Sequence, residues 1–463
     1  MIVPQSCHLG VAAGMAALQV FYNLATGIWN TAEWWNSANA LETTIDYSLL
    51  SDTLTYRGNI FNTFEKYKSS HFIDPWFYDD EGWWALTWIK AYDLTGEPRY
   101  LEMAKIIFND MKRGWDSTCG GGLWWKRQKQ QQQYKNAITN ELFLSVAAKL
   151  HLRSPGDSGP GSYIDWAKRE WNWFRQTGLI NRNHLINDGL DSVCQNNRQT
   201  TWTYNQGVIL GGLVDLYKST QNPLLLTQAQ AIADAAIHTL APNGILQEPC
   251  DSNCGGEGAE FKGVFIRNLY DLYQVTNKQL YKDFIIKNAD SIWSNRNRDN
   301  QFGFSWAKAI DSADATRQSA ALDAINAAIF LGTRGITYQA ENASLHQLPI
   351  AAGYNGARGR GYIVDWNHDG QSITFNVNVA CSGKYNLVFR YAAADSNASR
   401  SINVNGQMIV GNQIFPGTKS WNRWQSIVVS KVWLNAGNNS VTVSFNSFKG
   451  SSNWLNLDEM TIQ

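Results

Sequence analysis

The spacing of apolar residues changes near residue 335 and divides the chain into two parts. Before this point apolar residues recur every three or four positions, as on one face of an α-helix; after it they alternate with polar residues, as in β-strands. In the first part, some predicted helices have a single apolar face and others are apolar on nearly all sides, which indicates an outer and an inner layer. The one-faced helices are predicted over 101–111, 163–174 and 281–292, and the all-apolar helices over 83–94, 208–217 and 320–331.

The two kinds of helix alternate at a nearly regular interval. Each interval contains one helix–loop–helix hairpin, and with the N-terminal helices the first part holds about six hairpins. We therefore predict an (α/α)6 barrel over residues 1–334, with a cleft at the openings of its inner helices; an open solenoid is the alternative. Polar residues open the inner helices at Asp80, Asn140, Asn205, Lys262 and Arg317, with spacings of 60, 65, 57 and 55 residues.

The N-terminal segment does not resemble a signal peptide. Residues 1–10 lack a basic stretch, and 11–29 contains Gln19 and Asn23. This predicts an amphipathic helix over 11–29 rather than a membrane span, followed by helices over 38–50 and 60–67. Secretion is therefore expected from the function, not from a visible leader.

The second part, residues 336–463, is predicted to be an all-β sandwich or jelly roll, so that the protein has two domains. About eight short strands fit into its roughly 125 residues, and Asn405-Gly406 is a strong signal for a two-residue hairpin turn. The clearest strands are predicted over 373–379, 385–391, 401–404, 426–434, 440–445 and 455–462.

Composition favours a protein that binds neutral sugars. The chain has 21 Trp, 19 Tyr and 19 Phe with only 17% charged residues, and its 39 basic and 39 acidic residues cancel. Flat aromatic rings can stack on sugars, and a balanced charge gives no sign of nucleic-acid or membrane binding. The cysteines and histidines lack zinc-site spacing, whereas Cys250 and Cys254 are close enough for a local disulfide. We expect a monomer.

Two adjacent acids, Asp79 and Asp80, are the strongest candidates for catalysis. They follow the aromatic residues 76–78 and open a predicted inner helix. Acidic residues are also common in the first turn of a helix, where they meet the positive end of its dipole, and this structural role is the alternative. Retaining glycosidases hold two carboxyl groups roughly 5 Å apart, a distance that adjacent residues can reach. Crowding and aromatic surroundings would raise one of the two pKa values and leave an acid beside an anion.

The surrounding segment, WFYDDEGWWALTWIKAYDLTG, resembles the catalytic segment of the endo-α-1,6-mannanases of glycoside hydrolase family 76. The resemblance extends over residues 25–330 and implies an (α/α)6 barrel and retaining hydrolysis, with Asp79 as nucleophile and Asp80 as acid/base. It implies substrate contacts for Trp35, Asn36, Asn140, Asp188, Tyr204 and Asn205. Further segments match in the family's order: TAEWWNSANALETTIDY, CGGGLWWK, YKNAITNELFLSVAAKLH, INDGLDS, WTYNQGVILGGLVDLY and FKGVFIRNL.

Two points qualify these contacts. Asn140 and Asn205 are also candidates for capping inner helices, a role compatible with sugar binding. Before Phe-Lys-Gly, where the family has an Asp-containing stretch, this sequence offers Glu257 and Glu260. The contacts on that side of the cleft therefore differ from the family pattern.

The second part resembles carbohydrate-binding modules of the family 35 and family 6 type. The similar segments are ITYQAENA, GRGYIVDWNHDGQSITFNVNV, YNLVFRYAAAD, WLNAGNNSVTVSF and SNWLNLDEMTI. The resemblance implies a structural Ca²⁺ where the first and last strands meet, held by oxygen ligands from Gln339, Glu341 and Asp458. It implies sugar contacts for Tyr391, Trp424 and Asn453; for Trp424, plain packing is the alternative.

These observations together predict a secreted or cell-wall-associated endo-glycosidase that hydrolyses α-1,6-mannosidic linkages in mannan, needs no cofactor for catalysis and carries a sugar-binding module. One alternative is a transglycosidase that transfers mannan-type glycans to the cell wall. Another is a glycan-binding protein without catalysis, which the presence of both Asp79 and Asp80 disfavours. A third is an enzyme for acidic sugars, which would require basic residues where this chain has aromatic and amide side chains.

Overall fold

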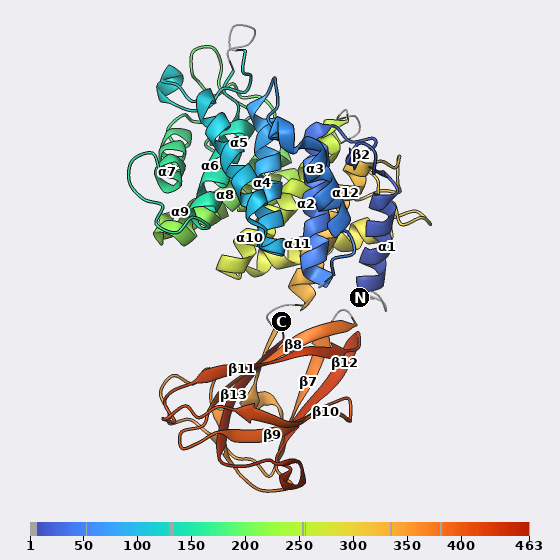
Figure 1. Ribbon diagram of the computed structural model, residues 1–463, viewed down its shortest axis with the longest axis vertical. Coiled ribbons are helices and arrows are strands. Elements are labelled where there is room, and N and C mark those ends of the chain that lie inside the picture. Colours follow the sequence, from blue (N-terminus) through green and yellow to red (C-terminus); the bar gives the residue numbers. More distant parts are fainter. Residues whose placement is uncertain are drawn as a thin grey trace. The chain divides into compact units, whose positions relative to one another are not determined.

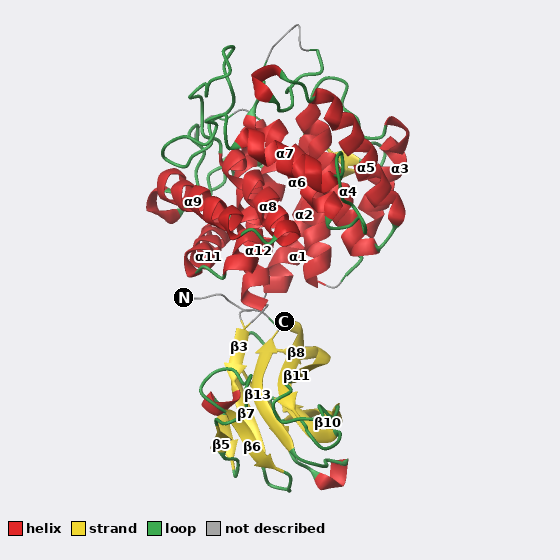
Figure 2. Ribbon diagram, turned by 90° about the vertical axis from the view of Figure 1, so that its left-hand side faces the viewer, coloured by secondary structure: helices red, strands yellow, loops and turns green. Residues whose placement is uncertain are grey.

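A computed structural model describes residues 7–51, 53–128, 134–251, 254, 256–333, 336–379 and 382–462. The glutamine-rich run at 130–133, expected to be an exposed loop, and the junction at 334–335 lie outside the described residues. The chain forms two compact units, one of residues Val11–Ala328 and one that contains Ile329–Gln463. The first is helical and the second is built of strands, and each is considered by itself (Figures 1 and 2).

Within the described residues the helical unit has twelve α-helices in two sets, as the two kinds of apolar pattern predict. Helices of one set have apolar residues buried on most sides, whereas those of the other bury one face. The inner set is α2 (Trp34–Ser51), α4 (Tyr78–Thr95), α6 (Ala137–His151), α8 (Thr203–Thr220), α10 (Phe261–Thr276) and α12 (Ala315–Thr333). The other set is α1 (Cys7–Gln19), α3 (Arg57–Tyr67), α5 (Pro98–Met111), α7 (Tyr163–Phe174), α9 (Pro223–Leu240) and α11 (Gln279–Ser294).

The predicted helix over 11–29 is wrong in its second half. Helix α1 ends at Gln19, and a small hairpin follows, formed by β1 (Tyr22–Asn23) and β2 (Ile28–Trp29). The side chain of Asn23 accepts hydrogen bonds from the amides of the next residues in the turn, at 2.9 and 3.3 Å. This local turn competes with the helix, because Asn side chains bond readily to nearby backbone groups.

The inner helices follow one another around the unit. The contacts run from α2 to α4, from α4 to α6, from α6 to α8 and from α8 to α10. Hydrogen bonds extend this order to α12 and back to α2: Arg267 reaches Asp323 at 3.0 Å, and the hydroxyl of Thr43 donates to Asp323 at 2.6 Å. The first and last helices of the series are therefore directly linked.

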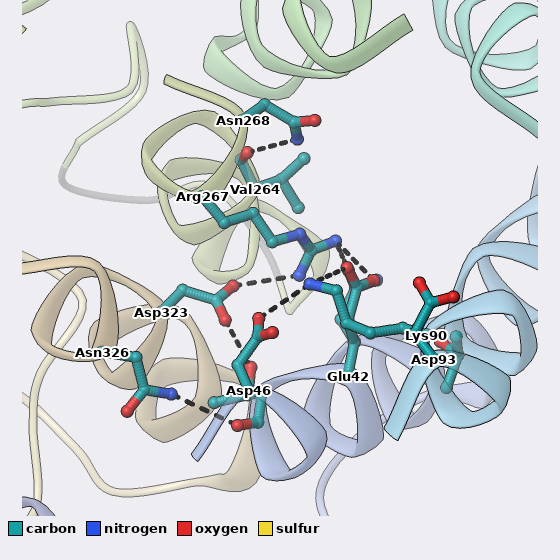
Figure 3. A network of polar contacts seen from close by, with 12 residues as sticks. Glu42, Asp46, Lys90, Asp93, Val264, Arg267, Asn268, Asp323 and Asn326 are labelled. Carbon is teal, nitrogen blue, oxygen red and sulfur yellow. Dashed lines mark hydrogen bonds and ion pairs between the residues drawn. The ribbon is translucent and has the colours of Figure 1, made fainter. Parts of the chain in front are cut away.

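A network of charged side chains joins four inner helices in the interior (Figure 3). Arg267 from α10 lies between Glu42 of α2, at 3.4 Å, and Asp323 of α12, at 3.0 Å. Lys90 from α4 pairs with Glu42 and Asp46, both at 2.9 Å. Burial opposes ionisation of Glu42, but the charges of Arg267 and Lys90 prevail and lower its pKa to about 2. The charged form of Glu42 is therefore maintained by cations from two other helices.

The second unit consists of two antiparallel sheets that share one apolar core. One sheet has the order β10-β9-β12-β7-β4, and the other has the order β11-β8-β13-β6-β5, with β3 also paired to β13. The strands are β3 (Ile336–Gln339), β4 (Ser344–His346), β5 (Ile350–Ala351), β6 (Tyr362–Trp366), β7 (Ser372–Val379), β8 (Gly383–Ala392), β9 (Ala398–Val404), β10 (Gln407–Phe415), β11 (Gln425–Leu434), β12 (Gly437–Ser444) and β13 (Leu455–Ile462).

All six strands that alternation predicted are present, and Asn405-Gly406 joins β9 to β10 with positive φ at both residues. The number of strands was underestimated: the described residues hold eleven in this unit, not eight. Strands β3 to β5 are only two to four residues long, too short to show alternation. Strand β10 lies at a sheet edge, is largely exposed and has two register irregularities, which hide its periodicity.

None of the described helices combines the length and the apolar composition needed to cross a membrane.

Candidate active site

The two candidate aspartates stand in the first turn of α4, which Tyr78 begins. The carboxylate of Asp74 accepts the amides of Trp76 and Phe77, each at 2.7 Å, and this turn directs the chain into the helix. Asp79 and Asp80 therefore meet the positive end of the helix dipole, as the capping interpretation requires. This structural role is compatible with a chemical role at the same position.

The two carboxyl groups have different surroundings. Asp79 is buried, and both of its oxygens have donors: the indole Nε1 of Trp125 at 3.0 Å and the amide of Asp80 at 3.2 Å. Asp80 is partly exposed, and no described residue donates a hydrogen bond to its carboxyl group. Hydrogen bonds to a carboxylate favour its charged form. The surroundings therefore favour the anion at Asp79 more than at Asp80.

The pKa values of the pair are both raised. Burial raises the pKa of Asp79 to about 7, against the effect of its hydrogen bonds. Burial and the negative charge of Asp79 raise the pKa of Asp80 to about 9, with smaller contributions from Asp74, Glu257 and Glu33. Because the two groups interact, these values describe the pair, which holds one proton between about pH 7 and pH 9.

The third acid of this turn, Glu81, has a different partner. It is fully buried and forms an ion pair with Arg127, which also binds Asp110 at 2.6 Å. The same arginine donates to the carbonyl of Asp74. Glu81 therefore anchors the catalytic turn instead of facing a ligand.

Aromatic rings from the openings of four inner helices pack together near the pair. Trp35 of α2 stacks on Trp83 of α4 at 5.5 Å, and Tyr204 of α8 stacks on Phe261 of α10 at 3.9 Å. Trp35 also contacts Phe261, and Trp83 contacts Tyr204, so the four rings form one group, here called the aromatic cluster. Arg267 of the charged network lies 6.0 Å from the ring of Trp83. The charged network therefore adjoins the aromatic cluster at Trp83.

The predicted amide contacts differ in their availability. Asn140 has its whole side chain engaged, since it accepts the amide of Leu123 at 2.7 Å and donates to the carbonyls of Leu123 and Asn136. Asn36 and Asn205 are buried, and their amide groups include atoms without a hydrogen-bond partner in the described structure. Asn140 therefore holds the loop at Leu123 in place. Asn36 and Asn205, in contrast, have buried polar atoms without hydrogen-bond partners in the described structure.

Asp188 is only half-buried and lies on the loop before α8. It accepts a hydrogen bond from the hydroxyl of Tyr134, and its carbonyl accepts the amide of Ala137 at 2.8 Å. Burial and the charges of Asp188 and Asp79 raise the pKa of Tyr204 far above its usual value. The charges of Asp188 and Asp79 therefore both act on Tyr204.

The loop that carries Trp125 is held at several points. A disulfide joins Cys119 to Cys194, and the second disulfide, Cys250–Cys254, is the predicted one. The ammonium group of buried Lys135 donates to the carbonyls of Thr118, Gly121 and Gly122 at 2.6 to 2.8 Å. These contacts restrain the approach to the aspartate pair.

The sequence did not identify several residues of the site. Trp125 lies in the segment CGGGLWWK, but nothing in the pattern separated it from Trp124, whose indole donates to Asp116 instead. Trp83 and Phe261 looked like ordinary core residues of inner helices. Their grouping depends on contacts between helices, which one sequence does not show.

In the second unit, the predicted calcium ligands lie around Gly359. A Cβ atom on this glycine would be 2.4 Å from both Gln339 Oε1 and Glu341 Oε1, so these side chains converge on one spot. Gln339 Oε1 and Glu341 Oε2 are buried and have no hydrogen-bond partner in the described structure. Asp458 is buried, accepts the amide of Arg358 at 3.0 Å and pairs with Arg390. No group of three His, Cys, Asp or Glu residues suited to a metal occurs in the described ranges.

Of the three predicted sugar contacts of this unit, one is buried and two reach the surface. Tyr391 is completely buried in the apolar core and donates its hydroxyl to the carbonyl of Pro416 at 2.9 Å, so its ring cannot stack on a sugar. Trp424 is partly exposed, and Asn453 is exposed. A stacked pair that the sequence analysis did not select, Tyr354 and Trp421, presents further aromatic surface beside Trp424.

Comparisons with known proteins agree with this division. A model of glycosyl hydrolase family 76 matches residues 15–340, and a model of the family 35 carbohydrate-binding module matches residues 336–463. The mannan endo-1,6-α-mannosidase DCW1 of Eremothecium gossypii is 28% identical over 260 residues, which are 51% of this chain and 57% of that protein. DFG5 of Saccharomyces cerevisiae, another mannan endo-1,6-α-mannosidase, is 30% identical over 208 residues, 41% of this chain and 44% of that protein. This chain spans about half the length of these relatives.

Solved structures show the same fold. The α-1,6-mannanase GH76A of Salegentibacter sp. HEL1_6 matches with a TM-score of 0.64 and 20% identity, over 70% of this chain and all of that one. That structure is an inactive variant with two consecutive aspartates changed to asparagine, bound to α-1,6-mannotriose. Dfg5 from Chaetomium thermophilum in complex with glucosamine has a TM-score of 0.61 and 18% identity, over 69% and 88% of the two chains.

Proposed function

The chain belongs to glycosyl hydrolase family 76, and on this premise we propose that it is a retaining endo-glycosidase that hydrolyses α-1,6-mannosidic linkages in mannan. The observation that carries the proposal is the unequal environment of two adjacent carboxyl groups, Asp79 with two donors and Asp80 with none among the described residues. Retaining hydrolysis requires this combination of a nucleophilic anion and a protonated acid. The relatives named mannan endo-1,6-α-mannosidase support the choice of linkage.

In this mechanism Asp79 attacks the anomeric carbon while Asp80 donates its proton to the departing glycosidic oxygen. The product of this step is a mannosyl ester on Asp79. Asp80, now an anion, removes a proton from water, which attacks the ester and releases a mannan fragment whose new reducing end keeps the original anomeric configuration. The two raised pKa values place the active protonation state between about pH 7 and 9.

The aromatic cluster supports a neutral sugar as substrate. Its rings come from the openings of α2, α4, α8 and α10, which is where the aspartate pair of α4 also stands. Tyr204 and Asp188 are half-buried and can approach a sugar directly, whereas Trp35 is buried. Asn36 and Asn205 are buried more deeply, so contact with substrate would require them to shift.

The experiment is the hydrolysis of linear α-1,6-mannan by the wild type and by Asp79→Asn and Asp80→Asn, with product anomers followed by NMR. We expect each substitution to lower kcat by about 10³-fold or more, since both groups act in the reaction. Asp93→Asn makes the same chemical change at the other end of α4, where Asp93 pairs with Arg153 on the surface, and should leave activity intact. Wild type that leaves α-1,6-mannan uncut would refute the substrate, and initial formation of reducing ends in the β-configuration would refute retention.

For the second unit we propose a sugar-binding module stabilised by Ca²⁺. Gln339, Glu341 and Asp458 are the protein ligands, and the ion would supply positive charge between the first and last strands. The converging oxygens around Gly359 and the unsatisfied atoms Gln339 Oε1 and Glu341 Oε2 support this. A chelator should lower the melting temperature of the wild type but not that of Glu341→Gln; equal effects on both would refute the site.

Trp424 and Asn453 remain the proposed sugar contacts of the module. Tyr391 is not a sugar contact, because its ring is buried. The exposed ring of Tyr354 and the partly exposed ring of Trp421 add to the surface beside Trp424. Retention on immobilised mannan should fall for Trp424→Ala and Trp421→Ala, and unchanged retention of both variants would remove this surface from consideration.

We propose four further properties of the protein. The series of inner helices is a closed (α/α)6 barrel, supported by the hydrogen bonds between α12 and α2, and the two sheets form a jelly roll. The protein acts outside the cell or at the cell wall, which two disulfides support, since such bonds persist in oxidising compartments. It acts as a monomer, which sedimentation equilibrium would test.

A further inference from the structure

Trp125 is held in register with the turn that carries the aspartate pair. Its carbonyl accepts the amide of Tyr78 at 3.0 Å, and its own amide donates to the carbonyl of Tyr134 at 2.9 Å. Two residues later, the amide of Arg127 donates to the carbonyl of Trp76 at 3.0 Å. The backbone that carries the indole is therefore attached to the chain directly before Asp79.

The indole ring is also restrained on its faces and edge. Phe77 packs against it with ring centres 4.9 Å apart, and Tyr134 meets it edge-on at 6.0 Å. The ammonium group of Lys126 lies 4.9 Å from the ring centre. A cation near the ring withdraws electron density from the indole and makes its N–H a stronger donor. That N–H reaches Asp79 Oδ2 at 3.0 Å.

We propose that Trp125 is the positioning residue that selects Asp79, rather than the adjacent Asp80, as the nucleophile. The inference rests on the proposed hydrolase function, because it concerns the division of roles within that pair. A hydrogen bond from a fixed donor favours the anion it contacts and holds the carboxylate in one orientation for attack. Asp80 receives no such bond from the described residues and keeps the proton that the reaction requires.

Other ionisable groups near the pair leave the role of Trp125 in place. The negative charge of Asp74 raises the pKa values of both Asp79 and Asp80, whereas Glu33 and Glu257 raise the pKa of Asp80, so these acids help to keep the proton on Asp80 but supply no donor to Asp79. Tyr204 is neutral because its pKa is raised. Lys126, the cation nearest to Trp125, acts on the ring that donates to Asp79.

The test compares Trp125→Phe with Trp124→Phe in the full chain. Both variants remove one indole N–H and keep an aromatic ring, but Trp124 donates to Asp116 at 2.7 Å and not to the pair. On α-1,6-mannan we expect Trp125→Phe to lower kcat about 10- to 100-fold, with KM changed less than about 3-fold. The acidic limb of its pH–rate profile should move up by about one pH unit, since the Asp79 anion loses a donor. Trp124→Phe should keep the wild-type profile.

A second measurement needs no substrate. Protein labelled with ¹³C at the aspartate side-chain carboxyl, with Asp79 assigned from the Asp79→Asn spectrum, reports the titration of that group directly. Its midpoint should rise by about one pH unit in Trp125→Phe and stay unchanged in Trp124→Phe. An unchanged midpoint for Trp125→Phe would overturn the inference, whether or not the wild type cuts mannan. Failure of the wild type on mannan with a shifted midpoint would refute only the substrate.

If Trp125→Phe does not fold, 3-benzothienylalanine at position 125 replaces the ring N–H by sulfur and keeps the indole shape. The same rise of the Asp79 midpoint is expected, and its absence would again overturn the inference.

Discussion

Replacing Arg267 by methionine tests whether the interior ion pairs stabilise the helical unit. Arg267 is buried and contacts Glu42, Asp323 and the side-chain carbonyl of Asn39. The lowering of the pKa of Glu42 from 4.5 to about 2 corresponds to about 3 kcal/mol of stabilisation by its cationic partners, Arg267 and Lys90. Methionine preserves the bulk of the side chain but leaves two buried carboxyl groups without their shared cation. Breaking such a pair typically costs about 3–5 kcal/mol.

The measurement is the melting temperature of the helical transition, followed by far-UV circular dichroism at 222 nm. The unit has roughly 320 residues, and unfolding entropy is about 2.1 cal/mol/K per residue, so we expect Arg267→Met to melt about 4–8 °C lower at pH 7. Arg57→Met is the matched control, because Arg57 forms a single, exposed pair with Glu97. Such a pair contributes about 0–1 kcal/mol, so this variant should melt within about 2 °C of the wild type.

The effect should depend on pH in a definite direction. In the wild type the folded-state pKa of Glu42 is lowered, so its stabilisation is present above about pH 4.5 and is lost as pH falls toward 2. Without Arg267, only Lys90 still opposes burial at Glu42, and the pKa of Asp323, which burial already raises to about 6, rises further, so the variant loses stability relative to the wild type as pH rises. The difference between the two proteins should therefore shrink between pH 7 and 4. A small difference that is independent of pH would refute the role assigned to the network.

Three further predictions concern the site. Asp80→Asn should raise the melting temperature while abolishing activity, because the folded-state pKa of Asp80 is raised to about 9 and its ionisation costs stability; the gain should be near zero at pH 4 and increase steadily toward pH 9, and a gain that falls with pH would contradict this. Trp76→Ala should raise KM for long mannan chains about 3- to 10-fold with little change in kcat, because 54% of this side chain is exposed beside the catalytic turn; an unchanged KM would remove it from the substrate path. Replacing Cys119 and Cys194 together by alanine should cost about 2–4 kcal/mol in denaturant unfolding, since the bond closes a loop with a sequence separation of 75, and replacing the pair Cys250 and Cys254, only 4 apart, should cost less; the reverse order would refute the loop-length argument.

Much of the fold follows from local periodicity. The inner helices are apolar on nearly all sides, and strands β7 and β8 alternate, so both signals survive in any short window of the sequence. The signal failed where polar side chains or short length decide the structure. Asn23 ends the first helical segment through hydrogen bonds to its own turn, and β10 at an exposed edge has no buried face to impose alternation.

The candidate site separates what the sequence determined from what only the tertiary structure decided. Adjacent acids at the opening of an apolar helix pointed to Asp79 and Asp80, because residue type and local pattern are properties of the chain itself. Their different roles depend on Trp125, 46 residues farther along the chain, whose indole reaches one carboxyl group and not the other. The sequence also did not show that the amide of Asn140 is fully engaged in hydrogen bonds or that the ring of Tyr391 is buried. Periodicity reports which face of an element is buried, whereas hydrogen bonding and exposure are set by groups that only folding brings together.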